Sequence, residues 1–322
     1  MTETDTISWL LGFDPAIRWQ VLRDIVGTPE SDWRAERAKV ETEGVGARLL
    51  SLQDADGQWA GGAFVPAGFT KREWEEEGQP RTATFDVLTV LRECGLDPSC
   101  ERMRKSVALI GANSRWDHAG QPYWEGEVEE CINGRTVADG AYFGADVSAI
   151  VVRLLSERQT DGGWNCERCN GSVRTSFATT INVLEGLLEF ERANGGTAQT
   201  QDARQTGEEF LLHRYLYRRQ STGAPADADF LRFIHPSGWR YDILRGLDYF
   251  RAAARAADAT PDPRLEPAIA HVRSRRLPDG RWPLDIRPRG RQWFELDDGP
   301  GQPSRWITLR ALRVLKWWDS YA

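Results

Sequence analysis

Apolar residues recur at intervals of three positions in several short segments of the chain. Residues 84–91 read Thr-Phe-Asp-Val-Leu-Thr-Val-Leu, and residues 180–187 read Thr-Ile-Asn-Val-Leu-Glu-Gly-Leu. Residues 240–247 and 305–312 fit the same frame. Leucines three apart are typical of one face of an α-helix, and little of the chain alternates with the period of a β-strand. The pattern therefore predicts an all-α protein.

A polar turn that ends in tryptophan precedes these helices. The sequence Asp-Gly-x-Trp occurs at residues 56–59, 161–164 and 279–282. Residues 109–116 look like a degenerate copy, and residues 236–239 look like a shortened one. Glycine supplies the positive φ that ends a helix, and the aspartate bonds to the local backbone. The indole is then expected to cover the end of the helix pair while its N–H finds an acceptor.

The repeating unit is therefore a helix, an Asp-Gly turn, a tryptophan, a loop and a second helix. One such hairpin cannot bury its own apolar face, so the copies are expected to stack as about five to six hairpins. Two earlier helices are expected, over about residues 15–26 and 31–52. Residues 193–205 and 221–229 are expected to be surface loops. We predict one domain over residues 1–322, with N-terminal helices in 1–44 and the repeats in 45–318.

Composition adds an excess of tryptophan and an acidic balance. The chain has 14 Trp against 12 Phe and 7 Tyr, and the turns explain part of that excess. Its net charge of −7 does not provide the excess of basic side chains that is typical of proteins that bind nucleic acid. No stretch approaches the ~18 apolar residues of a transmembrane helix, and the acidic N-terminus is unlike a signal peptide. Five cysteines, an odd number, favour a reducing compartment, so we predict a cytoplasmic protein.

The turns around Trp59, Trp164 and Trp282 resemble the QW repeats of the squalene-hopene and oxidosqualene cyclases. The resemblance covers roughly residues 45–318. It implies an α/α toroid, an architecture that the β subunits of protein prenyltransferases share. A single toroid is implied, whereas the triterpene cyclases carry two. The resemblance also implies a hydrophobic, isoprenoid-type ligand in a central cavity, with cyclisation or prenyl transfer as the chemistry.

Carboxylates are the candidate catalytic groups. The cyclases protonate their substrates with an Asp-x-Asp-Asp acid, and the nearest match here is Glu-Leu-Asp-Asp at residues 295–298. Asp297 would be the proton donor and Asp298 its partner. The alternative is a solvated turn before the last helix. Asp86, Asp139 and Asp242 are further candidates. Asp86 and Asp242 share one repeat column, where the alternative is a helix cap or a buried hydrogen bond.

The zinc ligands of the prenyltransferases are incomplete in this chain. Those enzymes bind zinc through Asp, Cys and His. Asp139 matches the aspartate, but Ala141 stands where the cysteine is expected and Ala178 where the histidine is expected. One ligand of three cannot hold the metal that activates a thiolate. The comparison argues against protein prenyl transfer.

A different cysteine cluster raises the possibility of zinc. Cys166 and Cys169 form a Cys-x-x-Cys pair, and Cys131 opens an earlier helical segment. Three thiolates and one histidine would complete a tetrahedral zinc site, with His235 or His118 as the fourth ligand. The alternative is a set of reduced cysteines without a metal.

Aromatic side chains are the candidate lining of a ligand cavity, because π-faces stabilise carbocations. The candidates lie in or beside the paired helices, and the alternative is that they belong to the helix-packing core: Tyr142, Phe143, Phe177, Tyr241 and Trp306, with Arg240 as an anion-binding group. Two functions stay open. One is an enzyme acting on an isoprenoid, and the other is a non-catalytic toroid that binds a ligand or a protein partner and carries a structural zinc.

Overall fold

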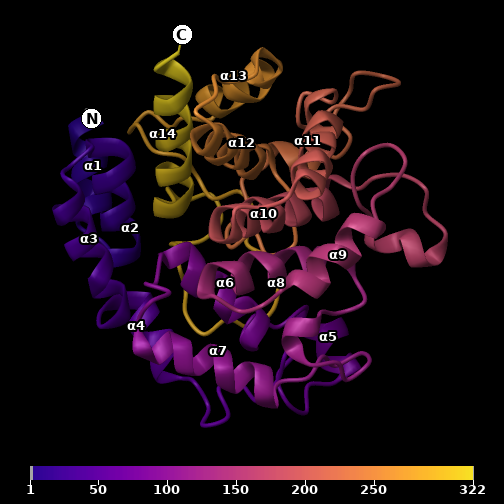
Figure 1. The fold of residues 1–322 in the computed structure, drawn as a ribbon. Helices are drawn as coiled ribbons and strands as arrows, with labels where there is room; N and C mark the ends of the chain where they lie inside the picture. The colour runs from indigo at the N-terminus through magenta and orange to yellow at the C-terminus, as the bar shows by residue number, and fades with distance from the viewer. Residues whose placement is uncertain (1–2, 322) are drawn as a thin grey trace. The chain divides into compact units, whose positions relative to one another are not determined.

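A computed structural model describes residues 3–321. Within them the regular secondary structure is helical, and β-pairing is confined to isolated bridges (Figure 1). The all-α class is therefore confirmed. The α-helices are α1 (Glu3–Leu11), α2 (Pro15–Val21), α3 (Glu30–Ala38), α4 (Gly44–Ser51), α5 (Lys71–Glu77), α6 (Thr84–Cys94), α7 (Glu101–Asn113), α8 (Glu130–Phe143), α9 (Ser148–Ser156), α10 (Phe177–Asn194), α11 (Ala198–Leu212), α12 (Ile243–Ala257), α13 (Glu266–Ser274) and α14 (Arg305–Asp319).

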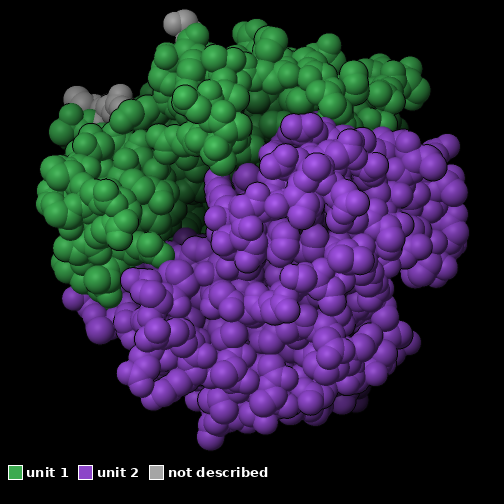
Figure 2. All heavy atoms as spheres, viewed as in Figure 1, with its two compact units in different colours: residues 1–39, 209–288, 295–322 green, residues 40–208, 289–294 purple. Residues whose placement is uncertain are grey.

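The chain forms two compact units, which Figure 2 distinguishes by colour. Unit 1 combines residues 1–39, 209–288 and 295–322, so it joins the first three helices to the last three. Unit 2 combines residues 40–208 with residues 289–294. The single domain expected from the sequence stays a prediction.

The three tryptophan turns have the same geometry. Trp59, Trp164 and Trp282 are fully buried. The indole N–H of each donates a hydrogen bond of 2.7 Å to the carbonyl ten residues earlier, in the last turn of α4, α9 or α13. The glycine two residues before each tryptophan has a positive φ of 83° to 111°. The predicted helix end, turn and indole cap are therefore present in all three copies.

A threonine from a later helix, α6, α10 or α14, completes each turn. The backbone N–H of each tryptophan donates to a threonine hydroxyl at 3.0 to 3.2 Å, and the acceptors are Thr84, Thr180 and Thr308. Thr84 and Thr180 were aligned correctly by the sequence. The segment of residues 305–312 was aligned wrongly. The sequence alignment placed Arg305 opposite Thr84, whereas Thr308 takes the place of Thr84 in the structure. The error of three residues arises because leucines three apart repeat equally well in either register.

The two weaker copies differ from the others. Trp116 is buried, but its indole donates to the carbonyl of Tyr123, on which its ring stacks at 4.6 Å. Trp239 is 41% exposed, so it does not cap a helix pair. The shortened copy therefore lacks the structural role that its sequence suggested.

In unit 1, α14 packs against helices from both ends of the chain. It contacts α2 and α12, and Figure 1 shows the yellow C-terminal helix beside the indigo N-terminal helices. The Arg313 guanidinium donates from Nε to Asp248 of α12 at 2.8 Å and from Nη1 to Gln20 of α2 at 2.8 Å. The N-terminal helices are thus part of this unit's core.

In unit 2, α8 and α10 cross with their backbones in close contact. A Cβ atom added to Gly134 would lie 2.6 Å from the carbonyl of Asn182, and one added to Gly186 would lie 2.3 Å from the carbonyl oxygen of Gly134. A side chain at either position would push the helices apart. The two glycines therefore permit this helix pair.

Two of the expected boundaries are wrong. The helix expected over residues 31–52 is interrupted after α3, because a short 3-10 turn follows and Gly44 has a φ of +69°. The loop expected over residues 193–205 is mostly helical, since α10 extends to Asn194 and α11 begins at Ala198. Residues 221–229 form a loop, as expected, which runs into the short 3-10 helix of residues 228–231.

Replacing Gly134 with alanine tests the α8–α10 contact. We expect Gly134→Ala to lower the free energy of unfolding by about 2 kcal/mol or more, because overpacking outweighs the helix propensity of alanine. The measurement is urea unfolding followed by circular dichroism. Gly12→Ala is the matched control, since its Cβ would meet nothing closer than 3.5 Å. Equal stability of the two variants would contradict the close backbone contact.

Candidate functional site

Two of the candidate carboxylates belong to a buried charge cluster on the facing sides of α6 and α8. Asp86 Oδ1 accepts a hydrogen bond of 3.0 Å from Arg135 Nη2. Asp139 accepts from the Thr89 hydroxyl at 2.7 Å and from Arg92 Nε at 2.7 Å. The same Arg135 Nη2 also donates to Thr89 at 3.0 Å. These five residues are called the charge cluster below.

Four of the five residues of the charge cluster are buried, Arg92 is partly exposed, and the cluster is only partly hydrogen-bonded. Arg135 and Asp86 are about 2% and 3% exposed, and Asp139 is fully buried. Burial raises the pKa of Asp139, although Arg92 and Arg135 oppose the increase. Arg135 Nε and Nη1 and Asp86 Oδ2 have no hydrogen-bond partner. Asp86 and Asp139 are therefore held in buried ion pairs within the charge cluster.

Asp242 has a capping role in unit 1. It is the N-cap of α12, where Oδ1 accepts from the backbone N–H of Arg245 at 2.9 Å. Its second oxygen accepts from the backbone N–H of Ile234 at 3.0 Å. Asp86 lies inside α6, whereas Asp242 precedes α12. The two residues are therefore not equivalent, and the repeated acid column expected from the sequence is not present.

Asp297 has the most distinctive environment among the candidate acids. Its carboxylate accepts from the Ser304 hydroxyl at 2.6 Å and from the backbone N–H of Arg305 at 3.0 Å. Burial raises its pKa to about 6, and the neighbouring Asp298 adds to the increase. The Asp298 side chain is 71% exposed, with Arg305 3.9 Å away. Asp297 therefore exchanges its proton close to neutral pH.

The candidate aromatic residues are mostly buried. Tyr142 and Tyr241 donate their hydroxyls at 2.8 Å to the carbonyls of Leu96 and Leu216. Phe143 and Phe177 are buried.

The remaining two candidate ligand-binding groups belong to unit 1. Trp306 stacks on His235 with ring centroids 5.1 Å apart, and the guanidinium of Arg240 lies 4.7 Å from the ring centre of Trp239.

Cys131 and Cys166 come together at the start of α8. The backbone N–H of Cys131 donates to Cys166 Sγ at 3.3 Å, and Cys131 Sγ donates to the carboxylate of Glu129 at 3.6 Å. Ligand atoms of Glu129, Cys131 and Cys166 lie within 4.8 Å of one another, and these residues are called the thiol site below. The hydrogen bond with Cys166, burial and the charge of Glu129 raise the pKa of Cys131 well above its usual value.

The other two expected zinc ligands are placed differently. Cys169 is exposed, and its Sγ donates to the carbonyl of Cys166 at 3.5 Å. His235 belongs to unit 1. Sequence reasoning missed Glu129, although its position two residues before Cys131 is a local signal that could have found it. The prenyltransferase ligand set does not fit, because Asp139 is engaged in the charge cluster and residues 141 and 178 are alanines.

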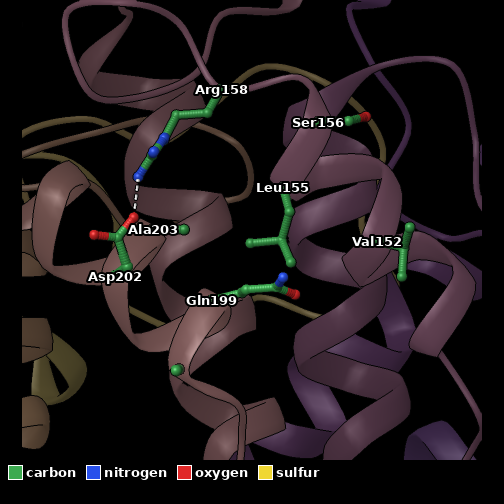
Figure 3. A pocket seen from close by; sticks show the side chains of 8 residues that line it. Val152, Leu155, Ser156, Arg158, Gln199, Asp202 and Ala203 are labelled. Atoms are coloured by element: carbon green, nitrogen blue, oxygen red, sulfur yellow. Dashed lines mark hydrogen bonds and ion pairs between the residues drawn. The ribbon is translucent and has the colours of Figure 1, made fainter.

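A surface groove of about 560 Å³ lies between α9 and α11 in unit 2 (Figure 3). Val152 and Leu155 of α9 and Ala203 of α11 are among its lining residues, and Arg158 and Asp202 pair across it at 3.0 Å. The volume suits a small molecule. None of the aromatic residues expected to bind a ligand lines this groove.

No protein-family model matches the chain, and none of the curated proteins matches it. Within residues 3–321, no helix combines the length and apolar composition needed to cross a membrane.

Removing Arg135 tests the charge cluster. Arg135→Met leaves Asp86 and Asp139 buried without this guanidinium, so we expect unfolding to become easier by about 3 kcal/mol. The control is Arg72→Met, which removes an exposed pair with Glu76 and should cost about 0.5 kcal/mol or less. Denaturant unfolding of both variants provides the comparison. A loss below about 1 kcal/mol for Arg135→Met would show that the cluster does not depend on this residue.

The raised pKa of Asp297 predicts a stability difference that depends on pH. Its folded-state pKa of about 6 exceeds the ordinary 3.8, so between these values the folded state retains a proton that the unfolded state releases. Rising pH therefore favours unfolding through this group. We expect Asp297→Asn to gain stability relative to the parent between pH 4 and pH 7, by on the order of 2 kcal/mol. A difference that is independent of pH, measured by thermal or urea unfolding, would contradict the raised pKa.

Proposed function

We propose that the chain binds a hydrophobic, isoprenoid-type ligand and protonates it from Asp297. The observation that carries the proposal is the environment of this carboxyl, which holds a proton near pH 6 in a partly buried site. The resemblance of the tryptophan turns to QW repeats supports the ligand class as an analogy of fold. The matched geometry of Trp59, Trp164 and Trp282 strengthens that analogy.

A general acid needs a proton to give and a stable place for the charge that remains. With a pKa of about 6, Asp297 is partly protonated near neutral pH. When it donates, the O–H bond breaks, a C–H bond forms at the ligand alkene and a carboxylate remains. The Ser304 hydroxyl and the Arg305 backbone N–H already donate to this carboxyl and would stabilise its anion. The resulting carbocation then loses a proton to a base and gives an alkene, or takes up a water molecule that loses a proton and gives an alcohol, and either step completes the balance.

Aromatic groups in the same unit suit a cationic intermediate. Trp306 follows Arg305 directly, so its ring is carried by the same turn of α14 that contacts Asp297. Tyr241 also belongs to unit 1. Indole and phenol faces attract a positive charge by about 0.5–2 kcal/mol each, more strongly where water is excluded. Asp297 with Trp306 is therefore the pair of residues to test.

The second candidate function is a non-catalytic protein that binds a ligand or a protein partner. The roles of three other acids favour it: Asp86 and Asp139 are held in ion pairs, and Asp242 caps a helix. Under this alternative the Ser304–Asp297 contact only fixes the start of α14. The two functions differ in whether a bound isoprenoid is converted.

Incubation with acyclic isoprenoids, followed by product analysis by gas chromatography and mass spectrometry, tests the proposal. We expect a cyclised or hydrated product from the parent protein, with a rate that falls as pH rises through about 6. Asp297→Asn should lower turnover by roughly 100-fold or more while retaining ligand binding, measured by quenching of tryptophan fluorescence. Asp229→Asn, which changes an exposed carboxylate paired with Arg232 outside the candidate site, is the control and should retain most of the activity.

The outcomes separate the two functions. Equal turnover by Asp297→Asn and the parent would exclude this acid. Isoprenoid binding without conversion would favour the non-catalytic function. Absence of both binding and conversion would overturn the ligand class.

A further inference from the structure

The thiol site gathers three donor groups that the charge cluster and Asp297 do not involve. Glu129 and Cys131 lie at the start of α8, and Cys166 begins the short 3-10 turn of residues 166–170. We propose that Cys131 Sγ, Cys166 Sγ and a carboxylate oxygen of Glu129 bind one zinc ion. This inference is independent of the proposed function, and its readout is metal binding.

The chemistry of the donors favours zinc over harder cations. Thiolate sulfur and carboxylate oxygen are both common zinc ligands, whereas magnesium and calcium prefer sites built from oxygen alone. Donor atoms within 4.8 Å of one another can surround a single ion. Glu129 is exposed, so the fourth position of a tetrahedral ion would open toward solvent.

An arginine clamps the turn that carries Cys166 onto the helix that carries Cys131. Arg168 Nε donates to Glu130 in the first turn of α8 at 2.8 Å, and its Nη2 donates to Glu157 at the end of α9 at 2.9 Å. Trp164, two residues before Cys166, is fully buried. The separation of the two sulfurs is therefore set by fixed elements on both sides, as a preformed metal site requires.

Two neighbouring groups fix the position of Cys166 Sγ. The sulfur accepts from the backbone N–H of Cys131 at 3.3 Å and from the Thr179 hydroxyl at 3.5 Å. It therefore lies beside the N-terminus of the 14-residue helix α8, where the backbone N–H groups carry a partial positive charge. These donors would orient the sulfur in the same way when it binds a metal.

Charged groups beside the site add to the attraction for a cation. Glu127 accepts from the backbone N–H of Glu129 at 2.7 Å, and Glu130 follows in sequence. Two arginines face these acids: Arg168 is paired with Glu130 and Glu157, and Arg153 is paired with Glu157 and donates to the carbonyls of Glu127 and Val128. The acidic groups here outnumber the two basic ones.

Cys169 provides a matched control within the same turn. It is exposed, its Sγ bonds to the carbonyl of Cys166, and it is absent from the group of clustered donors. The Cys-x-x-Cys spacing alone would make Cys166 and Cys169 the chelating pair. The geometry instead pairs Cys166 with Cys131. If Cys131 and Cys166 bind the ion, Cys169 is not needed for metal binding, and if Cys166 and Cys169 bind it, Cys131 is not needed.

Cobalt and zinc titration of the reduced, chelator-treated full chain tests the proposal. We expect about one Co²⁺ per chain, with the near-ultraviolet thiolate charge-transfer band and the strong visible bands of a tetrahedral ion, and displacement by Zn²⁺. Cys131→Ser and Cys166→Ser should each weaken Zn²⁺ binding at least tenfold and reduce the charge-transfer band. Loss of a group that only hydrogen-bonds to a metal ligand already lowers metal affinity by about 10–100-fold. Glu129→Gln should weaken binding by about tenfold, and Cys169→Ser should leave it unchanged.

Three results would overturn the proposal. The first is a reduced parent protein that binds neither metal. The second is loss of binding in Cys169→Ser, which would assign the ion to the Cys-x-x-Cys pair. The third is unchanged affinity in Glu129→Gln. That variant changes an exposed side chain, and circular dichroism of every variant separates loss of a ligand from loss of the fold.

Discussion

The rest of the structure depends on a hydrogen bond from an indole N–H to a carbonyl in the last turn of the preceding helix. The final carbonyls of a helix lack partners within it, and their loss of water must be compensated when the helix end is buried. Trp59, Trp164 and Trp282 each supply a second donor to such a carbonyl, which also accepts from the backbone N–H of the capping residue, while the ring covers the apolar end. One tryptophan side chain thereby donates a hydrogen bond to a buried carbonyl and covers the apolar surface beside it.

The same turns position both candidate sites. The carbonyl of Trp164 accepts from the backbone N–H of Ser176, which is the N-cap of α10, at 2.9 Å. The carbonyl of Trp282 accepts in the same way from Ser304, the N-cap of α14, at 2.9 Å. Cys166 lies between Trp164 and Ser176, and Asp297 bonds to Ser304. The variable loops that follow two of the repeated turns thus hold the two candidate sites.

The features that the sequence predicted well are local ones. In an Asp-Gly-x-Trp turn, the residues that end the helix and the glycine that takes a positive φ are neighbours in sequence. The burial of Trp59, Trp164 and Trp282 was therefore predicted correctly. The partners of Asp86 and Asp139 were not predicted, because Arg135 is 49 residues from Asp86 and no local pattern links them. The thiol site falls between these cases. Residue type identified Cys131 and Cys166, but only the fold shows that Glu129 replaces Cys169 in the cluster.

The contact between Gly134 and Gly186 has a mechanical consequence for the thiol site. The two glycines let the backbones of α8 and α10 touch, so they set the distance between these helices. Cys131 lies three residues from Gly134, about one helical turn or 5 Å along the axis of α8. Cys166 Sγ accepts from the backbone N–H of Cys131 on α8 and from the Thr179 hydroxyl on α10. A side chain at either glycine that spread the two helices would therefore also separate the two hydrogen-bond donors that hold this sulfur.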